Sequence, residues 1–234
     1  DHAGNIWMPT YAGGINIFSS YRQNFVNIGE RMGDKSGLNQ PLVNSVLLDN
    51  EKDEIWVGTD GGGLNHVDRT GNMVQYYPVR DMVNHKQSNI IKSLMWDRKK
   101  RIWIGTLEGI AIFEPQTGRA RYLELKKDKH IRVNALLSDG DKVWAGTENE
   151  GLIELTEEGV VDTVFVNVPG DNHGLSNNTV SSIIQDEAGK LWIGTRGGLN
   201  CYDPQTKIFT TYYDTKDMNN MNSRMVLSLY RDAN

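Results

Sequence analysis

Cysteines, long apolar runs and clustered histidines are scarce in this chain, and each scarcity excludes a class of protein. The single cysteine, Cys201, cannot form an internal disulfide, so the fold has to rest on a hydrophobic core. No apolar run approaches the roughly 18 residues that a membrane helix needs. The net charge is −5 and no basic stripe runs along the chain, so we expect no nucleic-acid partner.

Signs of catalytic chemistry are also few. The sequence contains no Gly-x-Ser-x-Gly turn and no phosphate-binding loop. The five histidines stand singly, without the spacing of metal ligands; they are His2, His66, His85, His130 and His173. We therefore predict no catalytic residue, no metal site and no cofactor, and we expect that the chain is not an enzyme.

Glycine, by contrast, is plentiful. The 24 glycines, with 38% hydrophobic and 24% charged residues, indicate a globular protein of many short strands joined by tight turns. No stretch has a sustained apolar period of 3.6 residues, which excludes a helical solenoid. The chain begins at Asp1, without a methionine or a signal peptide, and we expect it to be a piece of a longer protein.

A repeated tryptophan motif predicts the fold. The tryptophans recur 41 to 49 residues apart, for example from Trp103 to Trp144 and from Trp7 to Trp56, and this is the length of a propeller blade. Five segments carry the motif: Asn5-Ile6-Trp7-Met8-Pro9-Thr10, Glu54-Ile55-Trp56-Val57-Gly58-Thr59, Arg101-Ile102-Trp103-Ile104-Gly105-Thr106, Lys142-Val143-Trp144-Ala145-Gly146-Thr147 and Lys190-Leu191-Trp192-Ile193-Gly194-Thr195.

Three further features recur with the tryptophan. An aspartate ends the strand before it, a Gly-Leu-Asn-like strand follows it, and a turn and an aromatic strand complete the unit. Each unit thus offers four strands of period-two alternation. We predict an all-β chain, a β-propeller of four-stranded antiparallel blades, with five blades' worth in a single segment, 1–234. The approximate repeat units are 1–48, 49–96, 97–138, 139–185 and 186–231, and 232–234 starts the next unit.

Structural roles explain the shared residues. We expect the tryptophan to pack between neighbouring blades, because its large apolar area suits the space between two sheets. The glycine before the threonine should permit close approach of another backbone, and the threonine should hydrogen-bond locally at the strand end. Turn chemistry explains the repeated aspartate. Trp96 is expected to pack between blades rather than to stack on a ligand.

Longer stretches of the repeat resemble the two-component-regulator propeller repeat. The resemblance lies in Leu191–Thr195, in the Gly-Leu-Asn of 198–200, in the Asp-Pro-Gln-Thr of 203–206 and in the link 171–180. A second copy of the link is Asp34-Lys35-Ser36-Gly37-Leu38-Asn39-Gln40-Pro41-Leu42-Val43, and a third, decayed copy runs from 217 to 226, with Asn220 and Met221 in the places of Gly and Leu.

The resemblance implies a function. Such repeats form the sensor region of hybrid two-component systems, which gut Bacteroidetes use to detect glycan fragments. It implies a periplasmic location, an oligosaccharide or other small glycan as partner, and a parent that is a sensor histidine kinase, meeting the membrane only through parts outside this chain. It also implies that the five blades belong to a seven-bladed ring, although closure of five blades is an alternative. An open arc would leave blade faces uncovered, so we expect a homodimer in the parent.

The sequence departs from the repeat at three places. Pro9 replaces the glycine of the first tryptophan motif, and the links 80–90 and 126–132 lack the Gly-Leu-Ser signature that Gly174-Leu175-Ser176 forms in the link 171–180. Irregular links in repeat arrays can mark a functional face, and they can equally be decay without function.

A candidate ligand site follows by analogy with other propellers, where ligands bind at the mouth of the channel. If the Val-to-Asp strand is the inner strand A and the tryptophan strand is B, the B–C turns and the D–A links share one face. Arginines, amides and aromatic side chains there suit sugars. The predicted ligand-binding residues are Tyr11, Asp60, Glu148, Arg132, Asn178, Arg196 and Arg224.

Three functions stay open at this point. The repeat favours a ligand-sensing propeller that is not itself catalytic. A structural or dimerisation propeller without a ligand site of its own would need no special residues at all. A propeller lyase or glycosidase would need acids or histidines gathered on one face, and the scattered histidines count against it.

Overall fold

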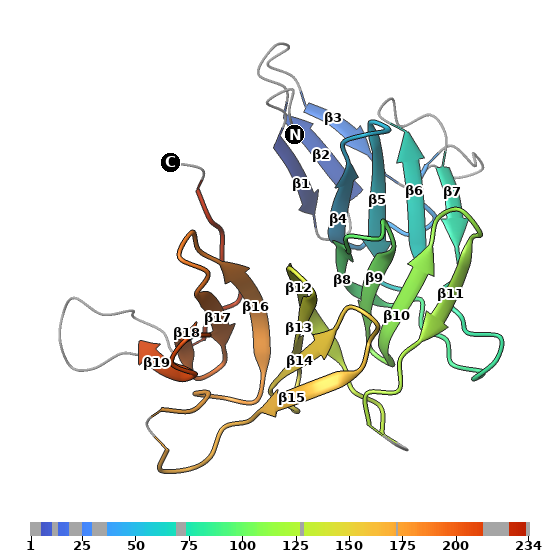
Figure 1. Cartoon of the computed structure of the whole chain (residues 1–234). Coiled ribbons are helices and arrows are strands. Elements are labelled where there is room, and N and C mark those ends of the chain that lie inside the picture. Colours follow the sequence, from blue (N-terminus) through green and yellow to red (C-terminus); the bar gives the residue numbers. More distant parts are fainter. Residues whose placement is uncertain are drawn as a thin grey trace. The chain divides into compact units, whose positions relative to one another are not determined.

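The computed structural model describes residues 6–10, 14–18, 25–29, 37–68, 74–126, 129–171, 173–212 and 225–232 (Figure 1). Within these ranges the chain forms strands β1 to β19 and no helix, and so none that is long and apolar enough to cross a membrane. The chain divides into two compact units, Asp1–Leu123 and Glu124–Asn234. The all-β prediction is confirmed.

The first unit contains three sheets, in which each strand pairs antiparallel with the next one along the chain. We call them blades 1 to 3. Blade 1 is three-stranded in the described residues, with β1 (Ile6–Thr10), β2 (Gly14–Phe18) and β3 (Phe25–Ile28). Blade 2 consists of β4 (Val43–Asp49), β5 (Glu54–Thr59), β6 (Leu64–Asp68) and β7 (Val74–Tyr77). Blade 3 consists of β8 (Ile91–Trp96), β9 (Ile102–Thr106), β10 (Gly109–Glu114) and β11 (Arg119–Tyr122).

The second unit contains two four-stranded sheets with the same up-and-down order, blades 4 and 5. Blade 4 consists of β12 (Val133–Asp139), β13 (Lys142–Thr147), β14 (Leu152–Thr156) and β15 (Val161–Phe165). Blade 5 consists of β16 (Val180–Gln185), β17 (Leu191–Thr195), β18 (Gly198–Asp203) and β19 (Ile208–Tyr212). The predicted A and B strands are therefore confirmed in blades 2 to 5, whereas the division into one segment of five repeat units stays a prediction.

One segment that carries the inner-strand pattern forms no strand in the described residues. Residues 226–232 match the A-strand pattern, but 225–232 is irregular in the structure. The segment still lies against blade 5, because the Val226 N–H donates to the Thr195 carbonyl at 2.9 Å and the Arg231 guanidinium donates to the Gln185 carbonyl at 3.0 Å. A strand needs a ladder partner, and in the described residues 225–232 pairs with no tryptophan strand.

The tryptophan of a blade packs against the following blade within each unit, as predicted. In the first unit, Trp56 of blade 2 lies edge-on to Phe113 of blade 3, with ring centroids 5.6 Å apart. In the second, Trp144 of blade 4 lies edge-on to Tyr202 of blade 5, also at 5.6 Å. Both tryptophans are almost fully buried. Trp96 also packs between blades, as expected, since its indole N–H donates to the Leu48 carbonyl of blade 2 at 2.9 Å.

The threonine that ends each tryptophan strand hydrogen-bonds locally, as predicted. Its hydroxyl donates to a glycine carbonyl across the B–C turn in blades 2 to 5, at 2.8 to 3.0 Å. These threonines are fully buried: Thr59, Thr106, Thr147 and Thr195. The bond satisfies a hydroxyl that burial would otherwise leave without a partner.

The glycine of the tryptophan motif makes room mainly for a side chain, where we had expected another backbone. A Cβ added to Gly146 would lie 2.5 Å from Val180 Cγ1, and one added to Gly58 would lie 2.4 Å from Ile91 Cγ2. In each case the neighbour is the first residue of the next blade's inner strand. Pro9 stands at this position in blade 1. It lies on β1, the edge strand of the three-stranded sheet in the described residues, where a missing N–H can be tolerated.

The repeated aspartate does more than form a turn. In blade 5 one oxygen of Asp186 accepts from the Lys190 N–H and the other accepts from the Trp192 indole N–H at 2.9 Å. Asp97 of blade 3 binds Trp103 in the same way, at 3.0 Å. The aspartate therefore ties its turn to the tryptophan of the strand that follows.

The length of the turn decides whether this bond forms. A spacing of six residues from aspartate to tryptophan gives the bonds of blades 3 and 5. In blade 4 the spacing is five, and the distance from Trp144 Nε1 to Asp139 Oδ2 grows to 3.5 Å. In blade 2 the spacing is seven, and the Trp56 indole N–H has no hydrogen-bond partner in the described structure. The Trp56 ring instead stacks on His66 at 4.0 Å.

We predict that Gly146→Ala destabilises the second unit by about 1–3 kcal/mol, because the new methyl group overlaps the Val180 side chain. Chemical denaturation measures the loss. The matched variant Gly146→Ala/Val180→Ala should lose less than the sum of the two single changes, because shortening Val180 relieves the overlap. Additive losses would show that the glycine is not there for Val180.

We also predict that the Asp97–Trp103 bond makes stability depend on acid pH. Burial raises the pKa of Asp97, but hydrogen bonds from the Arg101 N–H, the Trp103 indole and the Arg101 guanidinium outweigh it, so the net pKa is lowered. A carboxylate whose folded pKa is depressed stabilises the fold above its unfolded pKa of about 3.9, and this contribution disappears as pH falls through the folded pKa.

Asp97→Asn should therefore cost about 1.5–3 kcal/mol at neutral pH and flatten the loss of unfolding free energy below about pH 4. Denaturant titrations at several pH values measure both effects. Asp49→Asn is the matched control, because Asp49 makes no bond to Trp56 in the described structure. An equal effect of the two substitutions would assign the role to the turn alone.

Candidate functional site

The B–C turns and D–A links do meet at one end of the blades, as predicted. In blade 4 the Glu148 N–H donates to the Arg132 carbonyl of the blade's own link at 3.0 Å. The Glu148 carbonyl accepts from the hydroxyl of Thr179, which belongs to the link into blade 5. The Thr179 carbonyl in turn accepts from the Arg196 N–H at 3.1 Å. Arg132, Glu148 and Arg196 are thus brought to one face of the second unit.

Asp60 holds the equivalent place in the first unit. Its N–H donates to the Leu42 carbonyl of its own link at 2.8 Å, and it forms a bridge with Ile90 of the following link. Its carboxylate lies 3.9 Å from the Lys92 ammonium, with both side chains about one-third exposed. The same backbone geometry therefore repeats between blades 2 and 3 and between blades 4 and 5.

Ion pairs anchor the basic link 126–132. The Arg132 guanidinium donates to the Glu148 carboxylate at 2.9 Å, and Lys126 and Lys129 both pair with Glu150. The bond from Lys129 is the main cause that holds the pKa of Glu150 below its usual value. Two carboxylates of the adjacent B–C turn of blade 4, Glu148 and Glu150, thus offset part of the positive charge of this link.

The remaining predicted residues differ in whether their side chains are free to bind a ligand. The carboxamide oxygen of Asn178 accepts from the Asn167 N–H at 2.6 Å, a contact internal to the link. The Arg196 side chain is exposed, and its guanidinium forms no ion pair among the described residues. Tyr11 and Arg224 lie outside the described residues.

An asparagine of strand C positions the Gly-Leu-Ser link. In blade 5 the Asn200 side chain accepts from the Ser176 N–H at 3.0 Å and donates to the Ser176 hydroxyl at 2.8 Å. Asn65 of blade 2 accepts from the Asn39 N–H at 3.3 Å in the equivalent link. Both asparagines are fully buried, so these bonds satisfy polar groups that would otherwise be costly to bury.

The two irregular links carry other anchors. The blades that follow them have Ala111 and Ile153 in place of the strand-C asparagine. The link 80–90 is held by Asp81, which is buried and accepts from the Tyr122 and Val83 N–H groups at 2.9 and 2.8 Å. The link 126–132 is held by its ion pairs. A link with the Gly-Leu-Ser-like signature is therefore followed by a blade with the strand-C asparagine, and a link without the signature is followed by a blade without it.

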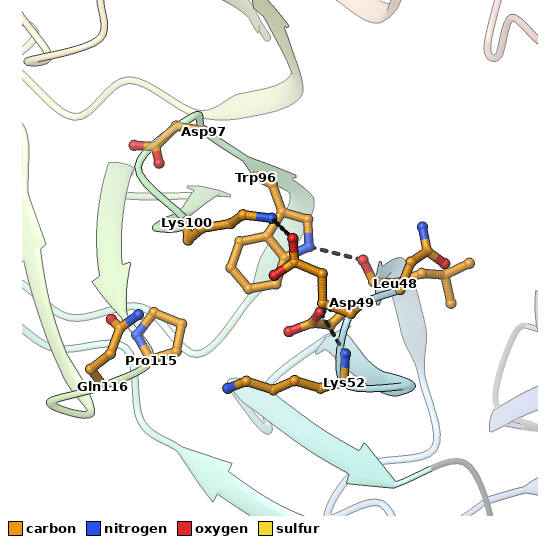
Figure 2. A pocket seen from close by; sticks show the side chains of 10 residues that line it. Leu48, Asp49, Lys52, Trp96, Asp97, Lys100, Pro115 and Gln116 are labelled. Atoms are coloured by element: carbon orange, nitrogen blue, oxygen red, sulfur yellow. Dashed lines mark hydrogen bonds and ion pairs between the residues drawn. The ribbon is translucent and has the colours of Figure 1, made fainter.

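A hollow lies at the opposite end of the blades, within the first unit (Figure 2). Its volume is about 480 Å³, and it lies between the A–B turns of blades 2 and 3 and the C–D turn of blade 3. Trp96 borders it on one side and Lys52 on another, and Pro115 and Gln116 face them across the open space. The hollow is further lined by Leu48, Asp49, Asn50, Glu51, Asp97 and Lys100.

Sequence reasoning missed this hollow, although the sequence contains a signal for it in the A–B turn of blade 2. The A–B turn of blade 2 is longer than the others and lacks the Asp-x-x-Gly form. Asp53 and Lys100 adopt left-handed backbone conformations, with φ near +60°, where blade 5 has Gly189. Non-glycine residues are uncommon in this conformation. Among the described residues no group of three or more histidines, cysteines or acids could hold a metal ion.

We predict that Asn200→Ala lowers the free energy of unfolding by about 1–3 kcal/mol, because it leaves the partly buried Ser176 N–H without an acceptor. Amide hydrogen exchange in 173–179 should accelerate more than exchange in β17. Ser176→Ala keeps the N–H to Asn200 bond and should have a smaller effect on both quantities. Equal effects of the two variants would mean that the hydroxyl, and not the backbone, is what Asn200 holds.

Comparison with known proteins places this geometry in context. The model of the family described as two component regulator propeller matches residues 85–108 and 174–197. A curated relative, the histidine kinase P4 of Formosa agariphila, is 25% identical over 208 residues, which are 82% of this chain and 15% of that protein. The chain therefore spans less than one-sixth of the length of this relative.

Solved structures share the fold at low identity. The extracellular domain of the putative one component system BT4673 from B. thetaiotaomicron matches with a TM-score of 0.75 and 20% identity, over 98% of this chain and 29% of that chain. The extracellular domain of the putative hybrid two component system BT3049 from the same organism matches with a TM-score of 0.64 and 23% identity, over 99% and 36%. The catalytically inactive H270A virginiamycin B lyase from Staphylococcus aureus matches with a TM-score of 0.69 and 15% identity, over 96% and 70%. The resemblance drawn from the sequence is confirmed: this chain contains two-component regulator propeller repeats.

Proposed function

We propose that this chain is an extracytoplasmic ligand-sensing segment of a hybrid two-component sensor histidine kinase, and that it recognises an oligosaccharide without catalysis. The observation that carries the proposal is the pair of matched regulator repeats within five blades of one design. The extracellular domains with the same fold belong to putative two-component and one-component systems, which supports a periplasmic location. We further propose that the blades form part of a seven-bladed ring in a homodimeric parent.

The proposed ligand site is the face of B–C turns and D–A links. Arg196 supports it, because an exposed guanidinium without an ion pair in the described structure is available to a carboxylate or sulfate. Arg132 and Glu148 lie beside it, linked through Thr179. Fixed backbone contacts hold the main chain of these residues in place before a ligand arrives, which lowers the ordering cost of binding.

The structural alternative has its own observation. The outer strand of blade 4, β15, exposes Val164, and Val160, Val166 and Val168 on either side of the strand are exposed as well; Asp162 is the one exposed charge among them. Outer strands usually carry charges that discourage pairing with other chains, and β11 of blade 3 follows that rule with Arg119 and Arg121. A structural or dimerisation propeller would use such an apolar edge. The enzyme alternative has only the likeness of fold to the lyase.

We predict that a panel of neutral and acidic oligosaccharides includes one class that raises the melting temperature of the propeller region. A ligand at a hundred times its dissociation constant adds about 2.7 kcal/mol, which corresponds to roughly 5–10 °C for a domain of this size. Differential scanning calorimetry measures the shift. A folded sample that shows no shift with any class would favour the structural alternative.

The same measurement tests the proposed site. Arg196→Ala should reduce the shift that an acidic oligosaccharide produces, because it removes the guanidinium available to the ligand. Arg119→Ala is the matched control, because this exposed arginine begins β11, at the opposite end of the strand from the links. A shift that survives Arg196→Ala unchanged would move the acidic-glycan site away from this face.

A further inference from the structure

We propose that the hollow at the A–B end of blades 2 and 3 is a second ligand site, and that it takes a neutral saccharide. It lies at the end of the blades opposite to Asp60 and the links, so it is separate from the face proposed above. The proposal goes beyond the proposed function in place and in ligand, although it shares with it the assumption that glycans are the signal. Its volume of about 480 Å³ falls within the range of about 300–1,000 Å³ that is usual for small-molecule sites.

Trp96 supplies a fixed apolar wall. Its indole N–H is already bound to the Leu48 carbonyl at 2.9 Å, and its ring meets Trp56 at 88° with centroids 6.4 Å apart. The ring is therefore held from two sides, and its remaining partly exposed surface faces the hollow (Figure 2). The equivalent inner-strand residues of the other blades are Leu48, Ser138, Gln185 and Arg231, so this aromatic wall is particular to blade 3. A rigid aromatic ring suits the apolar face of a sugar.

The charges around the hollow balance, which points to a neutral ligand. Lys100 pairs with Glu51 at 2.7 Å across the two blades, and Asp97 pairs with Arg101 at 2.7 Å. Asp49 and Lys52 remain, one charge of each sign, and Lys52 forms no ion pair within the described part of the chain. A strongly charged ligand would be repelled by a charge of its own sign on one side of the hollow. An uncharged ligand would meet none.

The polar groups of the wall are mixed donors and acceptors. The ammonium of Lys52 reaches toward Pro115 and Gln116 (Figure 2), and the carboxamides of Asn50 and Gln116 each offer both a donor and an acceptor. Asp49 uses one carboxylate oxygen to accept from the Glu51 and Lys52 N–H groups. Hydroxyl groups act as donor and acceptor at once, so a sugar ring lying on Trp96 matches this set better than a purely acidic or basic molecule does.

The backbone supports the same conclusion. Lys100 occupies a left-handed conformation that places its side chain in the pair with Glu51, at the rim of the hollow. Glycine, which blade 5 has at this position, would give the same turn without strain but would lose the rim. Asp53, in the same conformation in blade 2, ends the longer turn that carries Asn50, Glu51 and Lys52.

Isothermal titration calorimetry on the full chain tests the proposal. The probes are three neutral oligosaccharides, cellotetraose, xylotetraose and mannotetraose, and one acidic probe, trigalacturonic acid. We expect at least one neutral probe to bind, and we expect Lys52→Ala/Gln116→Ala to weaken that binding by about tenfold or more. Both side chains are exposed, so the variant should fold. Trp96→Phe keeps an aromatic ring and should weaken binding by a smaller factor.

Two controls separate the sites. Lys99→Ala removes an exposed lysine that belongs to the A–B turn of blade 3 but does not line the hollow. Arg196→Ala removes the guanidinium at the opposite end of the blades. Both variants should leave binding of the neutral probe unchanged. If Arg196→Ala loses that binding and Lys52→Ala/Gln116→Ala retains it, the hollow is not the saccharide site, and the proposed function still stands. Binding of trigalacturonic acid alone would do the same. If no neutral probe binds, the proposal is wrong.

Discussion

The tryptophan of each second strand cannot be covered by its own sheet, and much of the structure depends on this. A four-stranded sheet has two faces, and an indole on one of them stays exposed to solvent until another sheet packs on it. Trp56 is covered by Phe113 and Trp96 of blade 3, and Trp144 by Tyr202 of blade 5. The need for a covering neighbour explains why the motif recurs once per blade, and why the glycine beside it must stay small enough to admit Val180 or Ile91.

Because burial of an indole also buries its N–H, the turn before the tryptophan has a second task. The donor requires an acceptor, and the aspartate at the start of the A–B turn provides one when the tryptophan lies six positions after it. Blades 3 and 5 keep this spacing and the short bond. Blade 2 gives up the bond, and its longer turn instead forms one wall of the hollow beside Trp96. A local loss of regularity and a surface feature thus have the same origin.

The two ends of the blades have different chemistry for a structural reason. At the links, the Asn178 and Asn89 carbonyls accept from backbone N–H groups in the B–C turn of the blade before them, so many polar groups there are already satisfied and Arg196 remains available. At the A–B end the contacts between blades run through side chains, such as Lys100 with Glu51. Side-chain contacts leave gaps that backbone ladders do not, and the hollow is such a gap.

The sequence by itself determined the strands, their antiparallel order, the burial of the tryptophans and the local bond of each threonine, because all of these depend on period-two patterning and on turn residues close in the chain. It also placed Arg132, Glu148 and Arg196 at one face, since the strand order alone decides which turns share an end. Only the tertiary structure decided that Asn178 is used inside its link, that Ala111 and Ile153 accompany the irregular links, and that Lys52, Trp96 and Gln116 surround one hollow. These residues lie 44 and 20 positions apart along the chain, and what brings them together is the packing of one sheet against the next, which no local pattern encodes.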